Sequence, residues 1–127
     1  MPFASFLREG ATLAFGTDSP VVDVNPWSGI YTAVTRQDAK THEPKGGWLA
    51  SERISAADAI RAYTAGAAAS AGRENEIGKL AAGMWADIAA FDRNPLVDAE
   101  QRPELMLETH AIATFLAGRP VFDSRKA

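Results

Sequence analysis

The fold is decided near the start of the chain, where residues 11–20 are ATLAFGTDSP. The apolar run ends at Gly16, a carboxylate follows at Asp18, and Pro20 prevents any further strand. A short apolar run closed by turn residues is typical of a buried parallel strand. Ligands and catalytic groups collect at the carboxyl ends of such strands. We therefore predict a strand over residues 11–18, with Asp18 as the first candidate for catalysis.

Composition limits the classes of protein to which this chain can belong. It has 127 residues, 46% of them hydrophobic and 23% charged, as in an ordinary soluble domain with a core of its own. A net charge of −3 gives no reason to expect a nucleic-acid partner, and no apolar run approaches the roughly 18 residues of a membrane helix. The N-terminus carries Arg8 and Glu9 where a signal peptide would be apolar, so we expect a cytoplasmic protein.

The residues that commonly bind metals are scarce. The chain has no cysteine, which excludes disulfides and thiolate metal sites, and its two histidines, His42 and His110, lie far apart in sequence. A metal site built from this chain alone is therefore hard to assemble. We interpret His42 as a solvated loop residue and His110 as structural.

Three helices are predicted in the first 72 residues. The first covers residues 2–9. The second runs from Pro26 to about Arg36, with Asn25 as N-cap and an apolar stripe at helical spacing. A polar loop over residues 37–50 separates it from the third, which Ser55 caps and which continues through small residues to Ala71.

After residue 75 the hydrophobic pattern changes to the alternation of strands. We predict strands over residues 86–92, 109–116 and 120–123, the last two joined by a turn at Ala117-Gly118-Arg119. Asp87 is expected to fix a turn through backbone amides. The chain thus divides into an α/β part, residues 1–75, and a small β module, residues 76–127.

Two motifs, taken in order, resemble the amidohydrolase superfamily. Residues 13–20, LAFGTDSP, are similar to the last barrel strand of that superfamily, with its G-[ST]-D-x-P motif. Residues 77–88, IGKLAAGMWADI, resemble its C-terminal G-x-L-x-x-G-x-x-A-D turn. Between them, NPW at 25–27, AVTR at 33–36 and AIRAYT at 59–64 are similar to the amidohydrolase 3 branch, which includes N-acyl-amino-acid deacylases and YtcJ-like proteins.

This resemblance implies an α+β fold with two parts. Residues 1–75 would be the last strand and helices of a (β/α)8 metallo-hydrolase barrel, and residues 76–127 a small β-sandwich module. A complete barrel needs about 250 residues. The family's H-x-H motif, its bridging Lys or Glu and its two later histidines are absent here, and we expect them to lie before Met1.

The resemblance also implies roles for individual residues. Asp18 matches the residue that ligates the metal and acts as general base; the alternative is that Asp18 only organises the turn before Pro20. Trp27 and Arg36 are weaker candidates for substrate contacts. The alternatives are core packing for Trp27 and a surface salt bridge for Arg36.

These residues lead to one hypothesis with two alternatives. The chain is the C-terminal portion of a metal-dependent amidohydrolase that hydrolyses a non-peptide carbon–nitrogen bond, and it is inactive in isolation. The intact parent would hold zinc or iron and act on a small molecule, whereas this chain alone would bind no metal. One alternative is a non-catalytic oligomerising or binding domain, and the other is a split enzyme completed by a separate N-terminal chain. We also expect a homo-oligomer, and no nucleic-acid or membrane partner.

Overall fold

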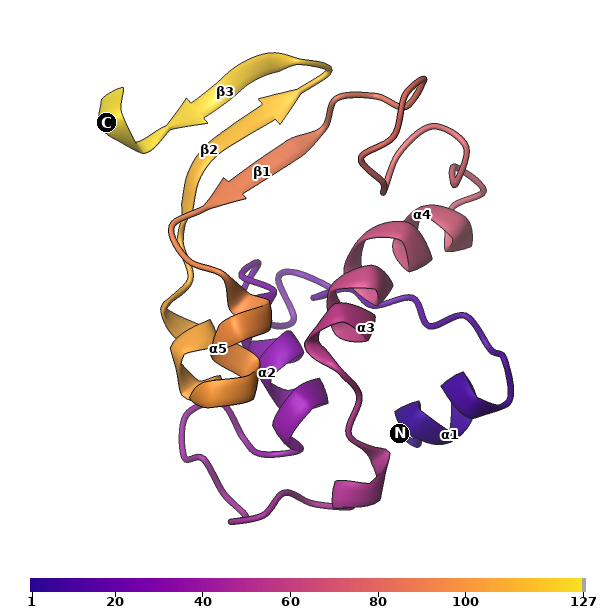
Figure 1. The fold of residues 1–127 in the computed structure, drawn as a ribbon, viewed down its shortest axis with the longest axis vertical. Coiled ribbons are helices and arrows are strands. Elements are labelled where there is room, and N and C mark those ends of the chain that lie inside the picture. Colours follow the sequence, from indigo (N-terminus) through magenta and orange to yellow (C-terminus); the bar gives the residue numbers. More distant parts are fainter. Residues whose placement is uncertain (127) are drawn as a thin grey trace.

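Helices form one end of the molecule and a small sheet forms the other (Figure 1). The computed structural model describes residues 1–126. The helical elements are α1 (Phe3–Arg8), α2 (Trp27–Thr35), η1 (Ala50–Glu52), α3 (Ala56–Arg61), the π-helical turn η2 (Ala62–Gly66), α4 (Ala67–Ser70), α5 (Pro95–Gln101), η3 (Pro103–Glu108) and η4 (Ser124–Lys126). The strands are β1 (Ile88–Phe91), β2 (Ala111–Leu116) and β3 (Arg119–Asp123). None of the helices in residues 1–126 has both the length and the apolar character needed to cross a membrane.

Helix α2 is the centre of the core. The side chains of Trp27, Ile30 and Tyr31 repeat at helical spacing and are at most 5% exposed. They pack with residues of α3 and with Met106 of η3, which is fully buried. The helix begins one residue later than predicted, and Oδ1 of Asn25 accepts a hydrogen bond from the backbone N–H of Trp27 at 3.0 Å. The predicted second helix is confirmed.

The predicted third helix is also present, as the continuous run of α3, η2 and α4. Ser55 caps it as predicted, because its Oγ accepts a hydrogen bond from the backbone N–H of Asp58 at 3.0 Å. The small residues of this run let other backbone segments approach closely. A Cβ on Gly66 would overlap the carbonyl oxygen of Leu13, which places residues 11–17 directly against this helix.

The prediction of a strand over residues 11–18 is wrong. The side chains do alternate as in extended chain: Leu13 and Phe15 are half-buried, whereas Ala14 and Gly16 are exposed. A strand also needs a hydrogen-bonded neighbour, and the three strands of residues 1–126 pair only with one another. The extended segment instead crosses the helix surface, where Phe15 donates its N–H to the carbonyl of Ala62 at 3.0 Å.

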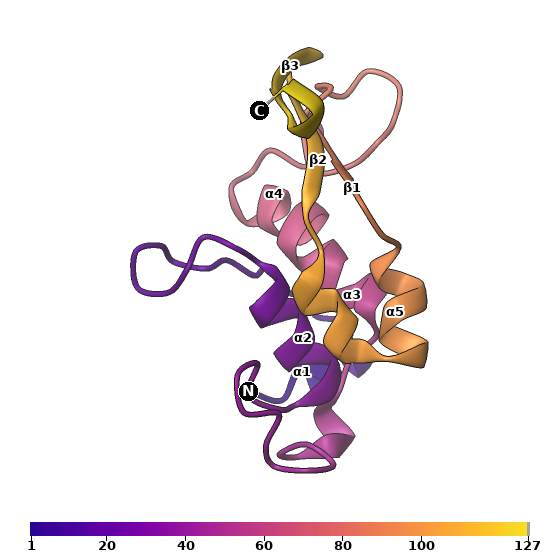
Figure 2. The same cartoon turned by 90° about the vertical axis from the view of Figure 1, so that its left-hand side faces the viewer.

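The sheet is antiparallel, with strand order β1-β2-β3. Both residues of the β2–β3 turn, Ala117 and Gly118, have positive φ angles, as a tight hairpin requires. Oδ1 of Asp87 accepts the N–H of Ala117 at 2.8 Å, which confirms the predicted role of this aspartate in fixing a turn. The sheet projects away from the helices (Figure 2), and β3 is exposed along most of its length. The coarse prediction of an α+β fold is confirmed, while the boundary at residue 75 stays a prediction.

Candidate functional site

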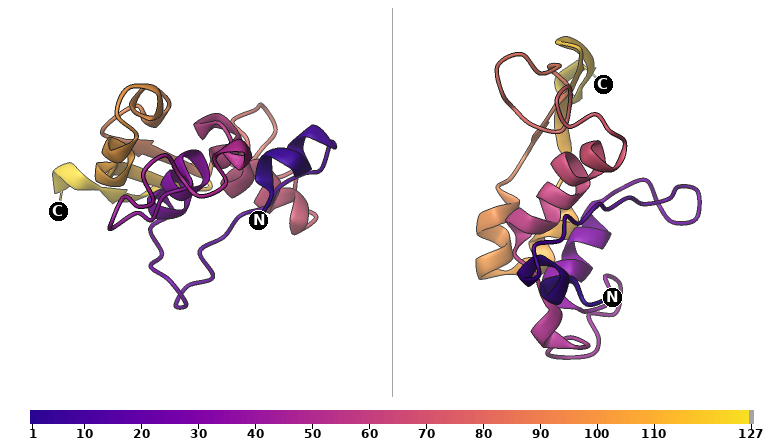
Figure 3. Two further views of the ribbon diagram at one scale, coloured as in Figure 1. Left: turned by 90° about the horizontal axis from the view of Figure 1, so that it is seen from below. Right: turned by 90° about the vertical axis from the view of Figure 1, so that its right-hand side faces the viewer.

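Asp18 lies where the extended segment ends and a long loop begins. That loop joins Asp18 to α2 and projects from the body of the molecule (Figures 2 and 3). The backbone of Asp18 is left-handed, with φ 52°, a conformation that Asp tolerates better than most residues. Its carbonyl accepts the N–H of Val21 at 2.9 Å and so closes the turn.

The side chain of Asp18 is exposed, and its carboxylate accepts no hydrogen bond from any residue in the range 1–126. The turn is therefore made by the backbone carbonyl of Asp18. This arrangement leaves both carboxylate oxygens available to a ligand. Its use in catalysis stays a prediction.

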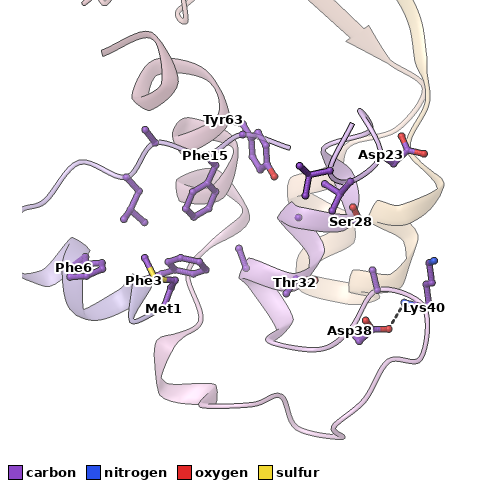
Figure 4. Close-up of a pocket in the computed structure, with 18 residues that line it drawn as sticks. Met1, Phe3, Phe6, Phe15, Asp23, Ser28, Thr32, Asp38, Lys40 and Tyr63 are labelled. Carbon is purple, nitrogen blue, oxygen red and sulfur yellow. Dashed lines mark hydrogen bonds between the residues drawn. The ribbon is translucent and has the colours of Figure 1, made fainter. Parts of the chain in front are cut away.

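A groove of about 930 Å³ opens beside the extended segment (Figure 4). Its walls come from α1, from the segment around Phe15, from the loop after Asp18 and from the exposed side of α2. Most of the lining is apolar, with Phe3 and Phe15 in contact at a ring-centroid distance of 5.0 Å. Polar groups are confined to the part near α2, where Ser28, Thr32, Asp23, Asp38 and Lys40 lie.

Tyr63 is the residue of this groove that sequence reasoning missed. Its ring stacks edge-on against Phe15 at 5.6 Å, and its hydroxyl reaches the groove beside Gly29. A Cβ on Gly29 would overlap that hydroxyl, so the glycine makes the room for it. Burial raises the pKa of the Tyr63 phenol above its ordinary value. Nothing in the helical pattern of residues 56–71 distinguishes Tyr63 from a core aromatic.

Trp27 and Arg36 lie outside this groove. Trp27 is in the core, 5% exposed, with its ring edge-on to Phe91 at 5.1 Å. Arg36 is 8% exposed, and its guanidinium lies over the rings of Phe3 and Trp48, at 5.2 Å and 5.7 Å from their centroids. Its Nε donates to the carbonyl of Trp48. Both side chains hold the fold together, and substrate contact by either stays a prediction.

The two histidines lie in different surroundings. His42 is in the loop over residues 37–49, where its Nδ1 is 2.7 Å from the hydroxyl of Tyr31. His110 precedes β2, and its backbone exchanges hydrogen bonds with Asp92. No three His, Asp or Glu side chains within residues 1–126 gather where they would hold a metal ion. The residues present therefore do not form a site for the metal that the resemblance implies, and Asp18 contributes at most one ligand.

Comparison with known protein families decides the relationship. The model of the amidohydrolase family, in its Amidohydro_3 form, matches residues 1–122. The chain belongs to the amidohydrolase family. This confirms the resemblance drawn from the motifs around Asp18 and Asp87.

Individual relatives agree with this assignment. The amidohydrolase chain is 34% identical over 120 residues to Protein LONG AFTER FAR-RED 3 of Arabidopsis thaliana, covering 94% of this chain and 19% of the relative. It is 34% identical over 92 residues to the putative amidohydrolase YtcJ of Bacillus subtilis, covering 72% and 17%. It is 31% identical over 97 residues to the N-substituted formamide deformylase of Arthrobacter pascens, covering 75% and 17%.

A solved structure shows the same fold within a longer chain. The crystal structure of an amidohydrolase from Thermotoga maritima matches with a TM-score of 0.67 and 19% identity, over 95% of this chain and 25% of that one. The amidohydrolase chain therefore spans about a fifth of the curated relatives' length and a quarter of the structural neighbour's.

Proposed function

We propose that this chain is the C-terminal portion of a metal-dependent amidohydrolase acting on a non-peptide carbon–nitrogen bond, and that it is inactive in isolation. The observation that carries the proposal is the family match over residues 1–122 in a chain that spans only 17–19% of its relatives. The unbonded, exposed carboxylate of Asp18 supports it further, because a site residue must remain free to meet a ligand.

The inactivity of the isolated chain follows from its ligand set. A catalytic zinc ion usually has three protein ligands. The described residues bring no such trio together, and the whole sequence has only two histidines. Asp18 would thus supply one carboxylate to a site whose other ligands come from outside this chain. No reaction step is assigned to the chain by itself.

A chimera tests the parent function. Residues 1–122, the part of this chain that the family model matches, would replace the corresponding part of the Arthrobacter pascens deformylase, and turnover of an N-substituted formamide would be measured. We expect activity that falls by about 100-fold or more when Asp18 is changed to Asn, as for loss of a catalytic group. The matched control is Asp23→Asn, which removes another exposed carboxylate of the same loop.

Folding of each chimera is checked by circular dichroism and by sedimentation. A folded, active chimera in which Asp18→Asn leaves turnover unchanged would contradict the role of Asp18. Equal losses in the Asp18 and Asp23 variants would also count against it, because the effect would then belong to the loop and not to one carboxylate.

A further inference from the structure

We propose that the π-helical turn η2 positions Asp18, with Ala62 and Gly66 as the positioning residues. These two residues hold the extended segment that ends at Asp18, and so they set where its carboxylate stands. The inference rests on the role proposed above for Asp18. The contacts that carry it are internal to this chain, since Ala62 and Gly66 are both buried.

The turn η2 interrupts an otherwise α-helical run. Ala67 donates its N–H to the carbonyl of Ala62, five residues earlier, where an α-helix bonds four residues back. Single π-turns inside α-helices are rare, and they frequently lie at functional sites. The contacts of this turn indicate what it does here.

The turn holds the extended segment at two backbone positions. The carbonyl of Ala62 accepts the N–H of Phe15 at 3.0 Å, the only backbone hydrogen bond that residues 12–17 donate within the described part of the chain. On the same face of the helix, Gly66 leaves room for the carbonyl oxygen of Leu13, which a Cβ would overlap. Because Leu13 and Phe15 are two residues apart in extended chain, these contacts fix both the position and the direction of the segment.

A third contact from the same turn holds the side chain of Phe15. The ring of Tyr63 packs edge-on against the ring of Phe15, with a centroid distance of 5.6 Å (Figure 4). The backbone and the side chain of Phe15 are therefore both held by η2.

The connection from Phe15 to Asp18 is short. Three residues of extended chain span at most about 10 Å. The chain then turns at once, because the carbonyl of Asp18 accepts the N–H of Val21 at 2.9 Å. A movement of Phe15 would therefore displace the carboxylate of Asp18. Catalytic groups have to be held to within about 0.5 Å, and misplacement by about 1 Å can lower turnover about 100-fold.

The alternative is that the same contacts only stabilise the fold. The two cases differ in what happens when the segment moves away from the helix. If η2 positions Asp18, the folded protein then has altered surroundings at the turn of Asp18 and a lower turnover. If η2 only stabilises, the folded molecules keep both unchanged.

Gly66→Ala is the sharpest test, because its methyl group would push the carbonyl of Leu13 away from η2. Phe15→Leu is a second, milder variant, which removes the ring contact with Tyr63 and keeps an apolar side chain at residue 15.

The matched control is Gly78→Ala. A Cβ on Gly78 would meet atoms of the same helical run, from Thr64, Ala65 and Ala68, instead of residues 11–17. It therefore disturbs the packing of the same helix without moving the segment that leads to Asp18.

Two readouts separate positioning from stability. In the folded isolated chain, the amide resonances of Thr17, Ser19 and Val21 should shift in Gly66→Ala and stay in place in Gly78→Ala. In the deformylase chimera described above, kcat should fall about tenfold or more in Gly66→Ala and less in Phe15→Leu. In Gly78→Ala it should stay within about twofold of the unsubstituted chimera.

The outcomes also separate this inference from the proposed function. Full turnover in Gly66→Ala and Phe15→Leu, beside a loss in Asp18→Asn, would overturn the positioning and leave the proposed function standing. Unshifted amides at Thr17, Ser19 and Val21 in both variants would overturn the positioning whatever the turnover. So would an equal fall of kcat in Gly78→Ala, because the loss would then follow stability. Unchanged turnover in Asp18→Asn would overturn the role of Asp18 and the positioning with it.

Discussion

The buried hydroxyl of Tyr31 lies 2.7 Å from Nδ1 of His42 and 3.1 Å from Oε1 of Gln37. The amide of Gln37 is oriented by its Nε2, which donates to the carbonyl of His42 at 2.8 Å. Because a hydroxyl has one proton, both contacts are satisfied only if Tyr31 donates to Gln37 while His42 donates from Nδ1. The three side chains thus tie α2 to the loop that borders the groove.

Removing this hydroxyl should destabilise the protein. In Tyr31→Phe, the oxygen of Gln37 and the Nδ1–H of His42 lose their shared partner. Because His42 is exposed and Gln37 is half-buried, water can replace that partner, and the expected loss of unfolding free energy is about 0.5–1.5 kcal/mol. Urea denaturation would measure the loss. The control is Tyr63→Phe, because the hydroxyl of Tyr63 makes no hydrogen bond within the described residues; its change should be below about 0.5 kcal/mol. Equal losses of unfolding free energy in the two variants would show that the hydrogen bonds of the Tyr31 hydroxyl do not stabilise the fold.

Stability should depend on pH through Glu52. Its carboxylate accepts the side-chain Oγ–H of Ser5 at 2.6 Å and the backbone N–H of Ser5 at 2.9 Å, and these bonds hold the pKa of Glu52 below its ordinary value of 4.5. A carboxyl whose pKa is lowered by folding stabilises the protein above its unfolded pKa. That contribution is lost as pH falls through the folded value.

Ser5→Ala should therefore lower the urea midpoint at pH 7, and the gap to the wild type should shrink below about pH 4.5 as Glu52 is protonated in both proteins. Ser70→Ala is the control, because the hydroxyl of Ser70 donates to the backbone carbonyl of Ala67 and not to a carboxylate. A gap for Ser5→Ala that is as large at pH 3 as at pH 7 would show that the hydroxyl does not act through Glu52.

Gly66→Ala should destabilise although alanine is the better helix former. In an open helix this substitution stabilises by about 1 kcal/mol. Here the new methyl group would overlap the carbonyl oxygen of Leu13, and overpacking of this kind costs about 1–3 kcal/mol. Urea denaturation would show whether the substitution lowers or raises the free energy of unfolding. A more stable Gly66→Ala variant would mean that residues 11–17 do not lie against the helix.

Helix starts could be predicted from the sequence, because they depend on a few neighbouring residues. The Asn-Pro pair at residues 25–26 predicted the start of α2, because an Asn side chain caps the first turn and proline suits it. An Asn-Pro pair also stands at residues 94–95, just after the predicted strand over residues 86–92. Asn94 accepts the N–H of Leu96, as Asn25 accepts that of Trp27, so this second pair begins α5 in the same way. Residues 94–95 therefore carry the same local signal for a helix start as residues 25–26.

Features that depend on distant contacts were not predictable in this way. The short apolar run at residues 11–18 correctly indicated extended chain. A paired strand also requires a hydrogen-bonded neighbour, which the pattern of one segment cannot reveal. The packing of Arg36 between Phe3 and Trp48 joins three separate regions of the chain. Tyr63 likewise reaches the groove because Gly29, far away in sequence, leaves room for its hydroxyl. Asp18 could be named as a candidate because a turn motif with a carboxylate is a local feature, and its catalytic role stays a prediction.

In the proposed function, this chain brings one carboxylate, Asp18, to an amidohydrolase site that it cannot complete alone. The most direct test is the zinc content of the purified chain. The wild type and the Asp18→Asn variant would each be incubated with zinc and desalted, and the zinc bound per chain would be measured by mass spectrometry. We predict far less than one zinc per chain, with no difference between the two proteins. One tightly bound zinc per wild-type chain, lost in Asp18→Asn, would contradict the claim.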